Sequence, residues 1–219
     1  MIIPTILTAD IDQVEKKLSF LKGQVDRVQI DVVDGKFASN KTITPSDLLG
    51  LAKKNNFLLD FHLMVEDPAA YLDKQNWPGE TNLVTAQIEA MPSQIEFIRQ
   101  AKEKGFLAGL ALDLKTKISK LDKQTLDMVD QVLLLGVEAG FSGQEIDPQI
   151  LPKIKDMVVW RGKERWFFKI GVDGGVDKTS LAFCHKMGAE EFYIGSALWE
   201  SKDPIGAIRR LEKIVNSSK

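Results

Sequence analysis

Cysteine and long apolar runs are scarce in this chain of 219 residues, and each scarcity excludes a class of protein. Cys184 is the one cysteine, so no internal disulfide can form. It lies in the helical pattern LAFCHKMGA, which indicates a buried thiol. No apolar run approaches the roughly 18 residues of a membrane-spanning helix. Residues 1–5 carry no positively charged leader segment. We therefore expect no secretory leader, no membrane association and a cytoplasmic protein.

An excess of one charge is also absent. The chain has 29 Lys and Arg against 31 Asp and Glu, and its formal net charge is −2. Nucleic-acid-binding proteins usually present a basic face, and membrane-surface helices a basic amphipathic stretch. We expect neither partner here. The short basic segment 161–165, between Trp160 and Trp166, is interpreted as an exposed turn between a helix and a strand.

What the sequence does contain is a series of short apolar runs, spaced about 25 residues apart as in strand–helix units. They are too short for helices and rich in Val, Ile, Leu and Phe, so we interpret them as buried parallel strands. The runs are residues 2–7, 26–33, 57–64, 82–88, 105–112, 130–137, 166–172 and 191–197.

Helical patterns lie between these runs, most clearly at residues 11–23, 95–105 and 204–218. Each expected strand is followed by helix or helix-like sequence, and no low-complexity linker divides the chain. The pattern predicts an α/β fold, a (β/α)₈ TIM barrel forming a single domain over residues 1–219. An open doubly wound sheet is the alternative, less favoured because no G-x-G-x-x-G follows the first run.

In such barrels the chemistry lies at the carboxyl ends of the strands. Polar residues at the predicted strand ends are Thr5, Gln29, Asp31, His62, Gln87, Asp113, Asp173 and Ser196. Any single one could be a satisfied strand-end residue or a helix cap. Their convergence on one rim favours a functional site. Asp34 is interpreted as a turn residue that serves Gly35.

Three glycine-containing turns follow the last three expected strands, at residues 140–144, 172–176 and 194–197. Glycine lets backbone N–H groups approach an anion closely. The loops after strands seven and eight often bind phosphate in TIM barrels. We therefore predict a phosphate site held mainly by backbone amides, with few cationic side chains nearby. Its residues are Gly140, Phe141, Ser142, Gly143, Gly174, Gly175, Gly195 and Ser196.

The same motifs, taken in order, resemble the ribulose-phosphate 3-epimerase family nearly end to end. The matching stretches are PTILTAD (4–10), IDVVDGKF (30–37), DFHLMVEDP (60–68), IEA (88–90), GFSGQ (140–144), VDGGV (172–176) and IGSA (194–197). Each is weak alone, and the ordered set is specific.

The resemblance implies interconversion of D-ribulose 5-phosphate and D-xylulose 5-phosphate. Two aspartates on opposite faces of the substrate exchange the C3 proton in this family, and they match Asp31 and Asp173. A divalent metal, usually zinc, stabilises the enediolate. Its expected ligands here are Asp31, His62, Asp173 and Gln29. The resemblance also implies a sugar-phosphate partner and a homo-oligomer.

The sequence departs from the family at the expected metal site. Gln29 stands in place of a family histidine, which shifts the preference from Zn toward Mn, Fe or Mg. Gln87 also stands where a histidine is usual. Together with Thr5 and Met64 it is expected to contact the substrate.

Three functions are compatible with these residues: the family epimerase with altered metal dependence, an epimerase or isomerase of another sugar phosphate, and a non-catalytic phosphosugar-binding barrel. Retention of both aspartates favours catalysis.

Overall fold

Eight parallel strands close into a barrel in the order of the sequence, and β8 pairs back onto β1. The structure, a computed structural model, describes residues 1–51 and 57–217. The strands are β1 (Ile2–Ile6), β2 (Arg27–Val33), β3 (Leu58–Met64), β4 (Thr81–Gln87), β5 (Leu107–Leu112), β6 (Gln131–Leu135), β7 (Lys169–Asp173) and β8 (Glu191–Ile194). The predicted TIM-barrel fold is thereby confirmed.

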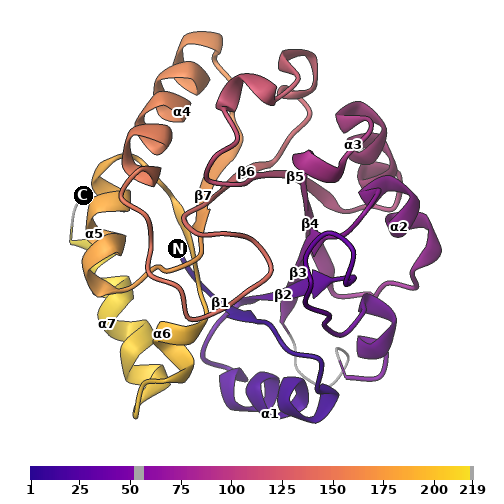
Figure 1. Ribbon diagram of the computed structural model, residues 1–219. Coiled ribbons are helices and arrows are strands. Elements are labelled where there is room, and N and C mark those ends of the chain that lie inside the picture. Colours follow the sequence, from indigo (N-terminus) through magenta and orange to yellow (C-terminus); the bar gives the residue numbers. More distant parts are fainter. Residues whose placement is uncertain (52–56, 218–219) are drawn as a thin grey trace.

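Helices surround the barrel as an outer ring (Figure 1). They are α1 (Ile11–Leu21), α2 (Pro68–Lys74), α3 (Gln94–Glu103), α4 (Ile150–Glu164), α5 (Lys178–Lys186), α6 (Ser196–Trp199) and α7 (Pro204–Asn216). Short 3₁₀ turns are η1 (Pro45–Leu48), η3 (Ile88–Ala90), η4 (Ile118–Lys120) and η5 (Lys123–Thr125). Within residues 1–51 and 57–217, no helix has the length and apolar character needed to cross a membrane.

The helices begin where the sequence supplies caps. Asp10 accepts hydrogen bonds from the first backbone N–H groups of α1, and Asp203 does so for α7, where Pro204 occupies the first turn. Val14 and Leu18, four residues apart, face the barrel from α1 and are fully buried. Cap and apolar spacing therefore agree, and this is why α1, α3 and α7 were predictable; residue 218 of the predicted helix 204–218 lies outside the described residues.

Two local predictions differ from the structure. Residues 161–164 form the last turn of α4 and Arg165 caps it in a left-handed conformation, so the predicted exposed turn at 161–165 is wrong. The helix continues because the apolar face of Ile154 and Met157 extends to Trp160, which packs edge-on against Trp166. Between β5 and β6 the chain forms only the turns η4 and η5, where helix-like sequence was expected.

Apolar side chains pack on both sides of the sheet because alternate strand residues face opposite ways. The larger cluster includes Val14, Ile30 and Phe61 and fills the space between strands and helices. A smaller cluster includes Ile3, Leu133 and Tyr193. Cys184 belongs to the larger cluster and is fully buried, which confirms the predicted buried thiol, and burial raises its pKa to about 11.

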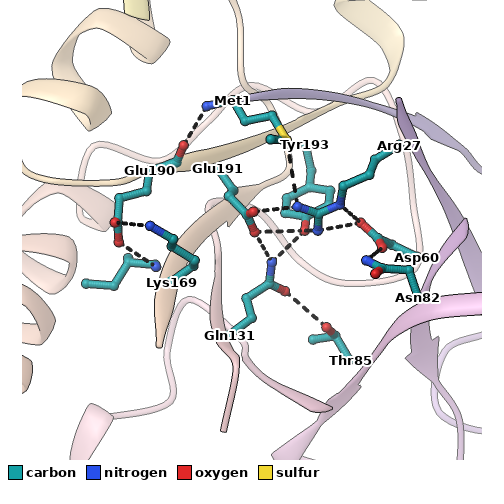
Figure 2. A network of polar contacts seen from close by, with 11 residues as sticks. Met1, Arg27, Asp60, Asn82, Thr85, Gln131, Lys169, Glu190, Glu191 and Tyr193 are labelled. Atoms are coloured by element: carbon teal, nitrogen blue, oxygen red, sulfur yellow. Dashed lines mark hydrogen bonds and ion pairs between the residues drawn. The ribbon is translucent and has the colours of Figure 1, made fainter. Parts of the chain in front are cut away.

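Near the amino ends of the strands, a group of linked polar side chains joins several strands (Figure 2). We call this group the basal polar cluster; it consists of Arg27, Asp60, Asn82, Thr85, Gln131, Glu191 and Tyr193. Arg27 on β2 pairs with Asp60 on β3 at 2.6 Å and with Glu191 on β8 at 2.6 Å. Gln131 donates to Glu191 at 2.6 Å, and Thr85 donates to Gln131 at 3.0 Å. The basal polar cluster thus lies at the opposite end of the barrel from the carboxyl ends of the strands, where the chemistry is expected.

Candidate active site

A pocket of about 250 Å³ lies at the carboxyl ends of the strands. The segment between β6 and α4 crosses the mouth of the barrel (Figure 1) and supplies part of the pocket wall. Most of the predicted site residues line this pocket: Thr5, Asp31, His62, Met64, Gly140, Phe141, Ser142, Gly143, Asp173, Gly174, Gly175, Gly195 and Ser196. Gln29 and Gln87 lie outside the wall, buried behind the side chains that form it.

Two carboxylates meet at the base of the pocket. Asp31 lies two residues before the end of β2, and Asp173 is the last residue of β7. The side-chain nitrogen of Gln29 lies between them, donating to Asp31 Oδ1 at 2.8 Å and to Asp173 Oδ2 at 2.7 Å. Gln29 and Asp31 share one face of β2 because they are two residues apart. Gln29 therefore holds the two acidic groups together.

His62 completes this group from the neighbouring strand, where it is the register partner of Asp31. Its Nδ1 lies 3.4 Å from Asp31 Oδ1 and 3.6 Å from Asp173 Oδ2. Its Nε2 lies 3.1 Å from the side-chain nitrogen of Gln87. The ring is almost fully buried, so these contacts fix both its position and its orientation.

Burial and charge shift the pKa values of this group in a consistent way. Burial raises the pKa of Asp31 to about 6, with a further rise from the Asp173 charge, while the nearby His62 ring and the hydrogen bond from Gln29 oppose the shift. Burial alone would lower the pKa of His62, but the two carboxylates outweigh it and raise the value to about 9. Asp31 can therefore exchange a proton near neutral pH.

The group Asp31, His62 and Asp173 could hold a metal ion. One ligand atom from each lies within 4.8 Å of the others. The distances of 3.4 and 3.6 Å from His62 Nδ1 are long for hydrogen bonds, and Nδ1 is buried without a hydrogen-bond partner. They are close to the roughly 3.3 Å between neighbouring ligands in a tetrahedral site with bonds of about 2.0–2.1 Å. The residues therefore fit a divalent cation.

The glycine turns approach the other side of the pocket. Gly140, Gly143, Gly174 and Gly175 all have positive φ, the region that favours glycine. A Cβ at Gly175 would come within 2.3 Å of the backbone nitrogen of Ile146, so the two loops are in close contact. These turns form the wall where a phosphate site is predicted.

Lys17 is a candidate that sequence reasoning missed, since few cationic side chains were expected near these loops. It projects from α1 into the pocket wall, with Nζ 4.9 Å from the centre of the Trp199 ring. Burial lowers its pKa, and no ion pair is formed to it within residues 1–51 and 57–217. The sequence around Lys17 does not indicate a role in the pocket, because the position of its side chain depends on the contact between α1 and Trp199 of α6.

Asp34 and His185 both lie outside the lining of the pocket. Asp34 accepts backbone hydrogen bonds from Lys36 and Phe37 around Gly35, which confirms a turn residue. His185 packs edge-on against Phe192 in the outer layer and does not line the pocket.

Comparison with known proteins identifies the family of the chain. The model of the "Ribulose-phosphate 3 epimerase family" matches residues 1–199. The chain belongs to the ribulose-phosphate 3-epimerase family. Curated relatives include the ribulose-phosphate 3-epimerase of Bacillus subtilis (strain 168), 34% identical over 212 residues, with 95% of this chain and 96% of the relative covered. That of Treponema pallidum (strain Nichols) is 32% identical over 197 residues, with 90% and 89% covered.

Solved structures of other enzymes share the fold of this epimerase family member. KGPDC from Streptococcus mutans superposes with a TM-score of 0.72 at 14% identity, covering 99% of this chain and 97% of that one. The 3-hexulose-6-phosphate synthase from Salmonella typhimurium gives 0.66 at 16% identity, covering 100% and 99%. At these identities the likeness shows the fold alone. In this chain Gln29 contacts both carboxylates, and Gln87 contacts His62.

Proposed function

We propose that this chain is a ribulose-phosphate 3-epimerase that interconverts D-ribulose 5-phosphate and D-xylulose 5-phosphate. The observation that carries the proposal is the pair Asp31 and Asp173, which lies in one pocket with the three glycine turns. An acid–base pair at one end and an anion site at the other match a small sugar phosphate. Curated relatives that cover nearly the whole chain bear the same name.

The two sugars differ in configuration at C3, so the reaction must remove a proton from one face and return one to the other. Asp31 and Asp173 come from strands separated by β1 and β8 around the barrel, and both face the pocket. We assign one as the base that takes the C3 proton and the other as the acid that returns it, with roles exchanged in the reverse direction. The raised pKa of Asp31, about 6, suits a group that must hold and release a proton.

The remaining residues of the group position the carboxylates. Gln29 donates to both, and the ring of His62 lies against both. A divalent cation held by Asp31, His62 and Asp173 would supply Lewis-acid stabilisation of negative charge on the sugar oxygens. A rotated Gln29 amide would offer its oxygen as a further ligand. This oxygen-rich set favours Mn²⁺, Fe²⁺ or Mg²⁺ over Zn²⁺.

The phosphate group is assigned to the glycine turns at 140–143, 174–175 and 195–196. The glycines in these turns carry no side chain, so their backbone N–H groups can approach an anion closely. Lys17 adds the positive charge on this side. A half-buried cation without a counter-ion in a pocket wall is stabilised by an anionic ligand, and this supports a phosphate as the occupant.

A coupled assay for xylulose 5-phosphate, run with Mn²⁺, Fe²⁺, Mg²⁺ and Zn²⁺ in turn, tests the proposal. We expect turnover that Asp173→Asn lowers by roughly 10²–10⁴-fold, the usual contribution of a general acid or base. Turnover no higher than that of Asp173→Asn with every metal would contradict it. If ribulose 5-phosphate still binds in that case, the chain is a phosphosugar-binding barrel; turnover of a different sugar phosphate would identify another epimerase.

A further inference from the structure

Gln87 is buried directly behind His62, on the side of the ring away from the pocket. Its side chain is fully buried, and its Nε2 lies 3.1 Å from His62 Nε2. Within the described residues, four buried side-chain atoms lack a hydrogen-bond partner, and two of them are the remaining polar atoms of these side chains, Gln87 Oε1 and His62 Nδ1. Two such atoms on neighbouring side chains suggest that each has a partner in the working site.

The position of the proton on the His62 ring determines which partners His62 Nδ1 and Gln87 Oε1 can have. A neutral ring carries one proton, so a ring whose Nδ1 lone pair faces a cation must carry its proton on Nε2. Only an acceptor can partner Nε2–H. The Gln87 amide offers one, because rotation of its terminal group by 180° exchanges nitrogen and oxygen at nearly the same positions.

We propose that Gln87 presents its side-chain oxygen to the Nε2–H of His62 and so keeps Nδ1 free to act as the metal ligand beside Asp31 and Asp173. Gln87 is thus a positioning residue, and the predicted substrate contact is replaced by a role through His62. This role adds a residue to the site described under the proposed function, and it rests on that function for the assignment of Asp31, His62 and Asp173 as metal ligands.

The rotation moves an amide N–H to the place that the oxygen occupies, where that N–H has no hydrogen-bond partner. This cost concerns one neutral group. In the alternative orientation of the Gln87 amide, His62 Nδ1 carries the ring proton and has no lone pair for a metal, so a cation bound here would lose one of its three ligands from Asp31, His62 and Asp173. Outer hydrogen bonds of this kind commonly set the tautomer of a ligating histidine. With a cation bound, the orientation of Gln87 that points its Oε1 toward His62 Nε2 is therefore favoured.

The experiment uses the full chain labelled with ¹⁵N in its imidazole rings and loaded with Zn²⁺, which serves as a diamagnetic probe. The chain contains two histidines, so His185 provides an internal reference in a simple spectrum. We expect His62 to carry its proton on Nε2 and to show a metal-bound Nδ1. A proton on Nδ1 with a bare Nε2 in the zinc-loaded protein would overturn the proposal, and this result needs no variant.

Calorimetric zinc binding to three variants gives a second readout. Gln87→Glu keeps an acceptor and should bind Zn²⁺ at least as tightly as the wild type. Gln87→Met removes the acceptor at similar size and should weaken binding by roughly 10–100-fold. Gln100→Met is the matched control, since Gln100 Oε1 is also buried without a partner but lies in α3.

Equal zinc affinity in Gln87→Met and the wild type would overturn the proposal, as would a wild type that does not bind zinc at millimolar concentration. If Gln87→Met does not fold, the ¹⁵N spectrum of the wild type and the zinc affinity of Gln87→Glu still test the proposal. Neither readout measures turnover. An inactive protein that shows the expected tautomer would therefore contradict the epimerase function and leave the role of Gln87 intact.

Discussion

At the scale of single residues, Gln29 decides how the acidic group is held. One amide nitrogen donates to Asp31 and Asp173, so it occupies the place between the carboxylates that a cation would share with them. We predict that Gln29→His raises zinc affinity at least about tenfold, because imidazole is a better zinc ligand than an amide oxygen. Calorimetry measures this directly.

The matched variant for this prediction is Gln29→Met, which fills similar space and offers neither donor nor ligand. It should bind zinc more weakly than the wild type and be less stable, because two buried carboxylates lose a shared donor. Unchanged affinity in Gln29→His would mean that a ligand at this position does not reach the centre.

The sequence predicted part of this site. Asp31, His62 and Asp173 were predictable because each lies near the carboxyl end of an apolar run, and parallel strands bring such ends to one rim. The contacts of Gln29 and Gln87 were not predictable, since an amide has the same sequence signal whether it faces a ligand or supports a neighbour. Its role depends on the register that pairs Asp31 with His62.

At the scale of elements, the packing of α1 against α6 places Lys17 beside the glycine turns. We predict that Lys17→Met raises the KM for ribulose 5-phosphate about tenfold, equivalent to about 1.4 kcal/mol, with kcat little changed. The charge acts on the phosphate, which is bound equally in the ground state and the transition state. Lys16→Met is the control, since Lys16 is an exposed neighbour in α1. Equal KM values in the two variants would contradict the assignment.

Two glycines of the pocket wall, Gly175 after β7 and Gly143 after β6, permit a matched pair of substitutions. Gly175 and Gly143 both have positive φ, but a Cβ at Gly175 would lie 2.3 Å from Ile146 N, whereas a Cβ at Gly143 meets nothing within 4 Å. Gly143→Ala should therefore cost only the backbone strain, about 1–2 kcal/mol. Gly175→Ala should cost more and weaken phosphate binding, because the loops must separate.

Urea denaturation and phosphate titration of both variants check this pair. Similar losses of stability in Gly175→Ala and Gly143→Ala would show that the close contact with Ile146 contributes little.

Helices and strands differ in how well the sequence revealed their limits. The helices α1, α3 and α7 were visible because caps and apolar spacing agree within each segment. The end of α4 was not, because Gly162 and a run of basic residues suggest a turn locally. The helix continues through them since its buried face, including Ile154 and Met157, is fixed by contacts with the barrel.

At the scale of the whole molecule, closure of the barrel followed from the count of strand–helix units, but the basal polar cluster did not. Arg27 and Glu191 are 164 residues apart and meet (Figure 2) only because β8 pairs with β1, which pairs with β2 on its other side. Each reads in the sequence as an ordinary charged residue before an apolar run. Pairing over such a separation is a property of the closed sheet.

This closure makes the basal polar cluster a test of barrel stability separate from catalysis. Arg27 is the cation between two buried carboxylates, Asp60 and Glu191, whose residues are 1% and 7% exposed. We predict that Arg27→Met lowers the free energy of unfolding by about 3–5 kcal/mol, the usual cost of leaving buried partners uncompensated. The paired Lys169→Met, which breaks an exposed ion pair with Glu190, should cost less than about 1 kcal/mol.

Urea unfolding of both variants measures the difference. The kcat of folded Arg27→Met should stay near that of the wild type, because the cluster lies near the amino ends of the strands and the acidic group at the carboxyl ends. A stability loss as small as that of Lys169→Met would mean that Asn82 and Gln131 alone satisfy the two carboxylates. A large loss of kcat with normal stability would instead mean that the charges of the basal polar cluster act on the site through β2, the strand that carries both Arg27 and Asp31.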